Sequence, residues 1–468
     1  MTNADFFNEM DGSLRSNRPC AVPLLLHWLC QHCALLQSGV SFAVSDTLTV
    51  FAQFYILFFT MQRKISKICF FTFLALSFLS AFSCARSNSV ASINEKDLFT
   101  INYGSFEDEL NLFNLSTSGS INTFMTMHDG FFYIANGESK KILELNSYGE
   151  LLTLYYNSEY TKTPSFADKT SVNSTKKAVE YPFNTLGPLA VDSNKCLYAV
   201  DTLPAERQEN DIENRLLLSY IVLRFNSDGT FIDYLGQQGP GGTPFPFIKN
   251  IYATKNNELV VVCESNEGPL VYWFNSSGFL LYSVPFNEKL VPKLKDLNDS
   301  ENINFISIEN VIPDSVSRKL YVQVNYFQNY LDPATKVQSG IDFEKTMLYP
   351  LNVETGLYEE GLDIPPHEES VSENLSKEVF SIPFDFLGVT DGGWFFFSVP
   401  TEKGYLIQMV QPSGQKILKR SLPVEHSEIL YYSLGLSGNG IISALYIKKE
   451  KAEIVWWRTD SLVSSFMN

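Results

Sequence analysis

One stretch, residues 187–284, contains the same pattern twice. The first copy reads GPLAVD (187–192), LYAVD (197–201) and LRFNSDG (223–229), and the second reads ELVVV (258–262) and VYWFNSSG (271–278). In each copy, short apolar strands alternate with polar gaps, and an Asn-Ser-x-Gly turn leads into one more strand. The stretch therefore encodes a repeated unit of three or four short antiparallel strands.

Such a unit cannot bury both of its faces alone, so it has to pack against copies of itself. This predicts an all-β fold, a β-propeller. The composition agrees, because 14% of the residues are aromatic and only 19% are charged, and aromatic side chains suit a half-buried pleated sheet. A propeller does not by itself determine what a protein does.

The turn can be followed along the chain to count the blades. Its glycine lies at positions 149, 229, 278, 356 and 414, and a sixth turn without glycine lies near Ser461. We therefore predict six blades, with seven as the alternative. The wider spacings indicate insertions, which we place at residues 161–180, 203–215, 289–304 and 365–377.

A ring of blades leaves two unpaired strand edges unless one more strand closes it. The segment LFTINY at 98–103 precedes the first unit and is the best donor. We expect it to complete the last blade, after which the chain soon ends.

The amino-acid sequence of the second unit resembles the NHL repeat. The matching residues are PLAVD at 188–192, LYAVD at 197–201 and IVLRF at 221–225, followed by Gly229. The resemblance implies a six-bladed propeller. It implies little about activity, because such propellers serve as protein-binding or nucleic-acid-binding scaffolds and sometimes as enzymes.

The sequence of the N-terminal region has the pattern of an export signal. Residues 61–67 are basic, residues 68–79 are apolar, and small residues precede Cys84, which is the plan of a signal peptide. The segment that ends at Cys84 resembles a bacterial lipobox of the looser kind found in spirochaetes, and this resemblance implies that Cys84 is lipidated. The alternative is a non-cleaved membrane anchor. Both alternatives export the body, so we expect a bacterial envelope lipoprotein, of spirochaetal origin, on the periplasmic side of a membrane rather than at the cell surface.

The domain division follows from this signal. Residues 1–60 are interpreted as an upstream extension from a wrongly assigned start codon, 61–84 as the signal peptide and 85–92 as a tether. Residues 93–468 form a single propeller domain.

Charge and cysteines exclude some functions. The formal net charge of −17 argues against a nucleic-acid partner, since phosphate binding needs a basic surface. Cys196 and Cys263 occupy non-equivalent positions in different units, so we expect two buried unpaired thiols rather than a disulfide.

The few candidates for chemistry are scattered. His128, His367 and His426 share no repeated position, which argues against a three-histidine metal site. Channel-lining carboxylates could come from a further set: Asp192, Asp201, Glu258 and Glu264. We interpret Asp192 and Asp201 as turn and strand-end carboxylates that accept backbone hydrogen bonds.

Two other patterns are interpreted as structural. Residues 296–307 resemble a calcium loop but lack its central glycine and its final glutamate, so they predict a solvated loop. The aromatic runs at 394–397 and 456–457 are expected to pack between blades, because alternate residues of a strand face opposite neighbours.

These observations favour a lipid-anchored propeller that binds another protein through its blade-edge loops, with no catalysis, no cofactor and no metal. We expect the membrane, through the N-terminal lipid, and an envelope protein as its partners. The alternative is a metal-dependent lyase or hydrolase with its site in the central channel. A third possibility is an assembly or scaffold factor for outer-membrane proteins.

Overall fold

A computed structural model describes residues 90–112, 122–167, 175–294, 303–332, 334–373 and 376–465. The predicted extension, the signal peptide and Cys84 lie outside the described residues. No helix within the described ranges is long and apolar enough to cross a membrane.

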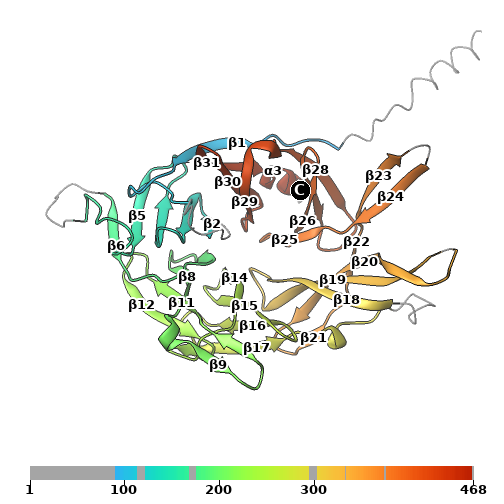
Figure 1. Ribbon diagram of the computed structural model, residues 1–468, viewed down its shortest axis with the longest axis horizontal. Coiled ribbons are helices and arrows are strands. Elements are labelled where there is room, and N and C mark those ends of the chain that lie inside the picture. Colours follow the sequence, from blue (N-terminus) through green and yellow to red (C-terminus); the bar gives the residue numbers. More distant parts are fainter. Residues whose placement is uncertain are drawn as a thin grey trace, which may run out of the picture. The chain divides into compact units, whose positions relative to one another are not determined.

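Six small antiparallel sheets stand around a central axis and form a six-bladed β-propeller (Figure 1). Blade 1 contains β2 (Thr123–His128), β3 (Phe131–Asn136), β4 (Lys141–Leu145), β5 (Leu151–Tyr156) and an added parallel strand, β6 (Lys177–Glu180). Blade 2 contains β7 (Leu189–Val191), β8 (Leu197–Thr202), β11 (Tyr220–Phe225), β12 (Phe231–Gly236) and the short β13 (Gly239–Pro240). Blade 3 contains β14 (Ile248–Ala253), β15 (Leu259–Ser265), β16 (Gly268–Phe274) and β17 (Leu280–Pro285).

The second half of the ring follows the same plan. Blade 4 contains β18 (Ile303–Pro313), β19 (Lys319–Leu331), β20 (Gln338–Asn352), β21 (Leu357–Tyr358) and β22 (Leu362–Ile364). Blade 5 contains β25 (Asp385–Val389), β26 (Phe395–Thr401), β27 (Gly404–Val410) and β28 (Ile417–Pro423). Blade 6 contains β29 (Ile429–Leu436), β30 (Ile441–Lys448), β31 (Lys451–Arg458) and β1 (Lys96–Asn102).

A few elements lie outside the blades. Two hairpins extend from connections: β9 (Glu209–Asp211) with β10 (Leu216–Leu218), and β23 (His367–Glu373) with β24 (Ser376–Ile382). The helices are short: η2 (Ala205–Arg207), η3 (Glu288–Leu290), η4 (His426–Glu428) and α3 (Asp460–Ser465).

The hydrophobic core is divided into six clusters, and each lies between two neighbouring blades. Strand alternation produces this arrangement, because successive side chains point to opposite faces of a sheet. In β3, Phe132 and Ile134 pack toward blade 6, whereas Tyr133 and Ala135 pack toward blade 2. Each blade therefore depends on both neighbours, as the sequence predicted.

The recurrent turn joins the third and fourth strands of a blade. In blade 1 the side-chain oxygen of Asn146 accepts hydrogen bonds from the backbone N–H groups of Tyr148 and Glu150, at 2.9 and 3.0 Å. Gly149 follows at φ 81°, a conformation that favours glycine. Asn226 and Asn275 accept equivalent bonds in blades 2 and 3. The Asn-x-x-Gly signal is thus a capped turn.

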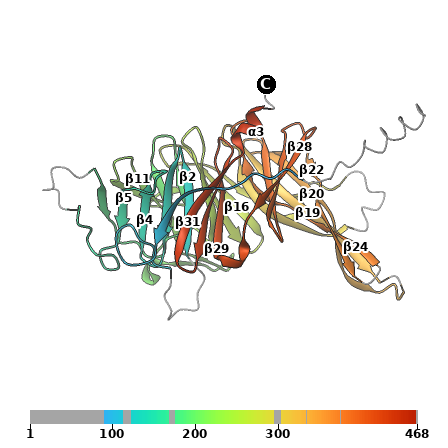
Figure 2. The same ribbon diagram turned by 90° about the horizontal axis from the view of Figure 1, so that it is seen from above.

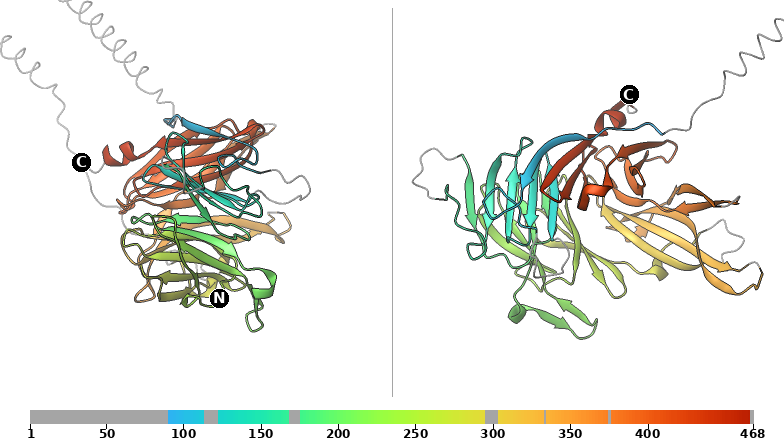
Figure 3. Two further views of the ribbon diagram at one scale, coloured as in Figure 1. Left: turned by 90° about the vertical axis from the view of Figure 1, so that its left-hand side faces the viewer. Right: turned by 45° about the horizontal axis from the view of Figure 1, so that its top comes forward.

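The predicted closure is confirmed. Strand β1 pairs antiparallel with β31, so the first and last strands of the chain complete one blade (Figure 3). This pairing also explains the missing sixth glycine: the fourth strand of blade 6 comes from the N-terminal side, so no turn follows β31. The chain instead enters α3 after Arg458, where the sequence pattern had indicated a turn.

The sequence pattern missed most of the strands nearest the axis. Strands β2, β14, β18, β25 and β29 were not predicted, because their channel-facing positions interrupt the apolar pattern with polar or exposed residues. It also underestimated blade 4, where β19 continues seven residues beyond the predicted end at Val324, to Leu331.

Closure makes a prediction about stability. Ile101 is 4% exposed and packs between blades 6 and 1, so Ile101→Ala should lower the free energy of unfolding by about 2–4 kcal/mol. The exposed Thr100 on the same strand is the control, and Thr100→Ala should have little effect. Urea denaturation followed by fluorescence measures both, and equal effects would mean that β1 does not seal the ring.

Candidate functional site

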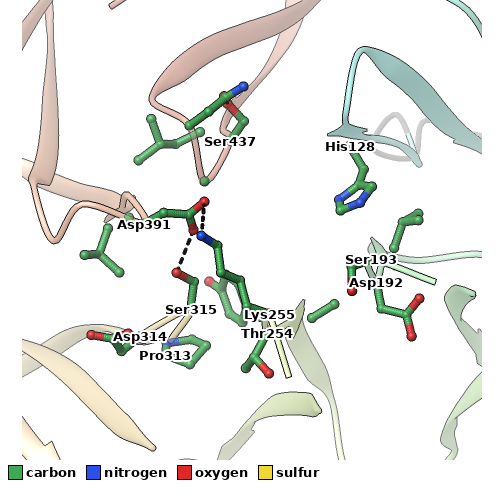
Figure 4. Close-up of a pocket in the computed structure, with 18 of the residues that line it drawn as sticks. His128, Asp192, Ser193, Thr254, Lys255, Pro313, Asp314, Ser315, Asp391 and Ser437 are labelled. Atoms are coloured by element: carbon green, nitrogen blue, oxygen red, sulfur yellow. Dashed lines mark hydrogen bonds and ion pairs between the residues drawn. The ribbon is translucent and has the colours of Figure 1, made fainter. Parts of the chain in front are cut away.

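A cavity of about 500 Å³ opens at one mouth of the central channel (Figure 4). Every blade contributes the end of its innermost strand and the turn that follows. His128 comes from blade 1, Ser193 from blade 2, Lys255 from blade 3, Ser315 from blade 4, and Asp391 and Ser437 from blades 5 and 6.

A polar network joins four blades at this mouth. The amine of Lys255 lies 2.9 Å from a carboxylate oxygen of Asp391, and the hydroxyl of Ser315 donates to the other oxygen at 2.8 Å. The backbone N–H of Asp391 donates to the carbonyl of Gly438, at 2.7 Å, in blade 6. The network ties together adjacent turns, and the half-exposed ion pair at its centre remains accessible from the channel.

The turn residues that line the mouth use most of their polar atoms locally. Thr254, Thr390 and Ser437 each accept a hydrogen bond from the backbone N–H four residues later, at 3.2, 3.1 and 2.9 Å. The residue after each capping side chain contacts another blade: Lys255 and Asp391 pair with each other, and the carbonyl of Gly438 accepts from the N–H of Asp391. A polar residue four or five positions before the second strand was the signal that could have placed Lys255 and Asp391 at the channel mouth, although not their pairing.

Asp192 and Asp201 are structural, as predicted. Asp192 caps its turn by accepting from the backbone N–H groups of Asn194 and Cys196, at 2.9 and 2.8 Å. Asp201 accepts from the backbone N–H groups of Asn184, Thr185 and Thr202. Both carboxylates are buried, at 3% exposure.

The two glutamates also have partners of their own. Glu258 accepts from Trp273 Nε1 at 2.7 Å and pairs with Arg318 of blade 4 at 2.7 Å. These contacts, acting against the effect of burial, lower the pKa of Glu258. Glu264, at the far end of β15, pairs with Lys249 at 3.1 Å. The four carboxylates considered for a metal site are therefore not gathered around the channel.

The three histidines do not meet either. His367 begins β23 and His426 lies in η4, whereas His128 ends β2 and lines the channel mouth. The end of the innermost strand lines this mouth in every blade, which the sequence pattern did not reveal. Its Nε2 lies 3.5 Å from a carboxylate oxygen of Asp129. Across the described ranges, no group of three His, Cys, Asp or Glu side chains could hold a metal ion.

The remaining side-chain predictions are mostly confirmed. The side chains of residues 394–397 are buried between blades, and Trp457 is fully buried, but Trp456 is only half-buried. Cys263 is buried and Cys196 half-buried, and both thiols are free. Residues 296–302 of the calcium-like segment lie outside the described residues, whereas residues 303–307, predicted to belong to the same solvated loop, begin β18.

The predicted insertions share one face of the ring, which we call the insertion face. In a four-stranded blade, the second-to-third connection and the crossing to the next blade lie at the same end of the sheet. Among the described residues, those connections include 157–167, 181–188, 203–219, 286–294, the turn between β19 and β20, 365–373 and 376–384, whereas residues 177–180 of the first insertion form β6 at the rim of blade 1. The opposite turn face carries the channel cavity and the capped turns.

The insertion face carries exposed apolar side chains on its projecting elements. Ile212 in the β9–β10 turn is 88% exposed, Leu290 in η3 is 68%, Val337 before β20 is 63% and Phe380 in β24 is 51%. Exposed apolar side chains also lie on the turn face, for example Tyr148 and Phe279, but those of the insertion face stand on elements that project from the ring.

Comparisons with known proteins identify no family. No family model matches the chain, no curated protein matches it, and the resemblance to the NHL repeat stays a prediction.

Several solved structures are similar at low identity. An ulvan lyase from a new family of polysaccharide lyases is 10% identical, with a TM-score of 0.34, covering 78% of this chain and 83% of its own. The hydrazine synthase of Kuenenia stuttgartiensis is 10% identical, with a TM-score of 0.34 and coverages of 72% and 80%. The Dos1 propeller is 11% identical, with a TM-score of 0.33 and coverages of 77% and 94%. Values this low say nothing of the activity of this chain.

The buried Asp201 makes a prediction about pH. Burial raises its pKa to about 6, against the lowering effect of its three backbone donors. The folded state therefore binds the proton more tightly than the unfolded chain, whose Asp pKa is near 4. This advantage is present below about pH 4 and is lost as the pH rises through 6.

The free energy of unfolding of the wild type, relative to Asp201→Asn, should accordingly fall between pH 4 and pH 7 by up to about 3 kcal/mol. Denaturant titrations at several pH values measure this difference. The exposed Asp211, whose pKa is lowered by contacts with Asn214, is the control, and its Asn variant should show no such fall. A difference for Asp201 that does not change with pH would contradict the prediction.

Proposed function

We propose that this propeller is a lipid-anchored binding module of a bacterial envelope, and that its insertion face holds another protein. The observation that carries the proposal is the common placement of the insertions and their exposed apolar side chains on one face. Loops on a rigid scaffold are the usual position of binding residues. The blades provide that scaffold, because all six interfaces between them are packed with buried side chains.

The contacts of the candidate carboxylates and of the residues at the channel mouth favour a binding function over catalysis in the channel. The carboxylates considered for a metal site are engaged in hydrogen bonds and ion pairs within the protein, and they lie at opposite ends of their blades. The Lys255–Asp391 pair joins blades 3 and 5 directly, and Ser315 of blade 4 donates to the same carboxylate. These contacts support a structural role for the channel mouth.

The proposed anchor is compatible with an accessible insertion face. Residues 91–93 run beside β28, with the N–H of Ile93 donating to the carbonyl of Ser421 at 2.9 Å and the N–H of Ser421 donating to Ala91. Strand β28 is the outermost strand of blade 5 (Figure 1). The chain thus joins the ring at its rim, away from the axis. A lipid on Cys84, with a second acyl chain, would supply firm membrane attachment.

Lipidation is tested by Cys84→Ser. This variant, expressed in a bacterium that processes lipoproteins, should lose incorporation of an alkyne-labelled fatty acid and move from the detergent phase to the aqueous phase on Triton X-114 partitioning. Cys196→Ser, which changes a thiol within blade 2, should keep both properties. Retention of label by Cys84→Ser would contradict the proposed anchor.

Binding through the insertion face is tested by photo-crosslinking in intact cells. A benzoyl-phenylalanine side chain at Ile212, Leu290 or Phe380 should form adducts with a partner protein. The control positions are Tyr148 and Phe279, which are 83% and 61% exposed on the turn face and should form none. Adducts confined to the turn face would assign binding to the opposite side and contradict the proposal.

A further inference from the structure

The contacts that hold the channel mouth together leave space and polar groups for a ligand. The cavity of about 500 Å³ is in the size range of small-molecule sites, which combine apolar walls with a few fixed polar groups. Ala253, Leu387 and Leu436, on the innermost strands β14, β25 and β29, supply a half-buried apolar wall. The pair of Lys255 with Asp391 stands in the turns that follow β14 and β25 (Figures 2 and 4).

Two other carboxylates at the mouth are used within their own turns. Asp192 accepts from two backbone N–H groups of its turn and from the hydroxyl of Tyr198 at 3.3 Å. Asp314 likewise accepts from two backbone N–H groups of its turn and from the hydroxyl of Tyr321 at 2.9 Å. Both carboxylates are directed away from the centre of the mouth (Figure 4). Neither faces the space that a ligand would occupy.

His128 faces the Lys255–Asp391 pair across the mouth (Figure 4). Its Nε2 lies 3.5 Å from a carboxylate oxygen of the exposed Asp129, so a positive charge on this ring would be offset by its neighbour. The mouth therefore presents both signs of charge to a ligand, without an excess of one.

The Lys255–Asp391 pair keeps unused hydrogen-bonding capacity. Its side chains are 54% and 30% exposed. An ammonium group has three donors, and a carboxylate has about four acceptor positions. Within the described part of the chain, the amine pairs only with Asp391, and the carboxylate contacts only that amine and the hydroxyl of Ser315. Donors and acceptor positions therefore remain side by side where the pair meets the cavity.

Two adjacent charges of opposite sign favour a ligand that carries both. A lone carboxylate beside the amine of Lys255 would also meet the negative charge of Asp391. A lone ammonium beside Asp391 would meet the charge of Lys255, because the two groups are only 2.9 Å apart. An α-amino acid has a carboxylate and an ammonium on one carbon, so it can place each charge next to its opposite. Its side chain can then lie against the apolar wall.

We propose that the channel mouth binds a free α-amino acid with an apolar side chain. The carboxylate of the ligand pairs with Lys255, its ammonium pairs with Asp391, and its side chain contacts Leu387 and Leu436. The site lies on the turn face, so it goes beyond the proposed function of the insertion face. The outcome of photo-crosslinking on the insertion face has no bearing on it.

The test is isothermal titration calorimetry of the purified protein with L-leucine and matched analogues. L-Leucine should bind with a Kd below about 1 mM. L-Leucinamide lacks the carboxylate, 2-hydroxy-4-methylpentanoate has a hydroxyl in place of the ammonium, and L-serine lacks the apolar side chain, so each should bind at least about tenfold more weakly. Absence of leucine binding, or equal affinity for leucine and the first two analogues, would overturn the proposal.

Variants assign each charge of the ligand to its partner. Lys255→Met and Asp391→Asn should each weaken leucine at least about tenfold. In Lys255→Met nothing remains to recognise the carboxylate, so leucine and leucinamide should bind equally. In Asp391→Asn the preference for leucine over 2-hydroxy-4-methylpentanoate should disappear in the same way. Weaker binding with both preferences unchanged would contradict the assigned contacts.

Two further variants separate the site from other effects. Lys249→Met is the matched control, because Lys249 is also on β14, is 42% exposed and pairs with Glu264 at 3.1 Å; it should bind leucine as the wild type does. Ala253→Phe fills the cavity and leaves both charges in place, so it should abolish binding. Thermal unfolding without ligand establishes that each fold is intact. Equal loss in Lys249→Met, or unchanged binding in Ala253→Phe, would place leucine elsewhere and overturn the site.

Discussion

The pairing of β1 with β31 is the interaction on which the rest of the ring depends. Each inter-blade cluster needs two blades, so six clusters exist only if the ring closes. Ile101 shows the link directly, because it belongs to β1 yet packs with side chains of blades 6 and 1. Without β1, blade 6 would expose both an unpaired edge and part of an apolar face. The stability of every blade therefore includes a contribution from the two ends of the domain.

A second constraint acts at the channel. The turn after each innermost strand has to satisfy its backbone N–H groups, and Asp192, Thr254, Thr390 and Ser437 do so with side-chain oxygens. A ring of polar residues at the axis thus arises from turn geometry alone. This explains why Asp192, one of the carboxylates that suggested a metal site, has a structural role. The insertion face is free of this constraint.

The sequence predicted those parts of the fold in which a regular apolar strand is followed by a turn that its own residues identify. The second and third strands of each blade alternate in a regular way, and Asn146 and Gly149 mark a turn that needs no distant partner. Most of the innermost strands were not predicted, because one face of each lies toward the channel and its polar or exposed residues interrupt the apolar pattern. The pair between Lys255 and Asp391 could not be predicted, because it joins residues 136 positions apart (391 − 255) that only the closed ring brings together.

Closure also sets a limit on when the domain can finish folding. Ile101 pairs with Ala452, 351 positions later (452 − 101), in a chain of 468 residues. The contact cannot form until residue 452 has been synthesised, and such long-range pairings slow folding. During synthesis and any transfer across a membrane, the early blades are present while the ring stays open. The domain gains its full cooperativity in one late step, when its two ends meet.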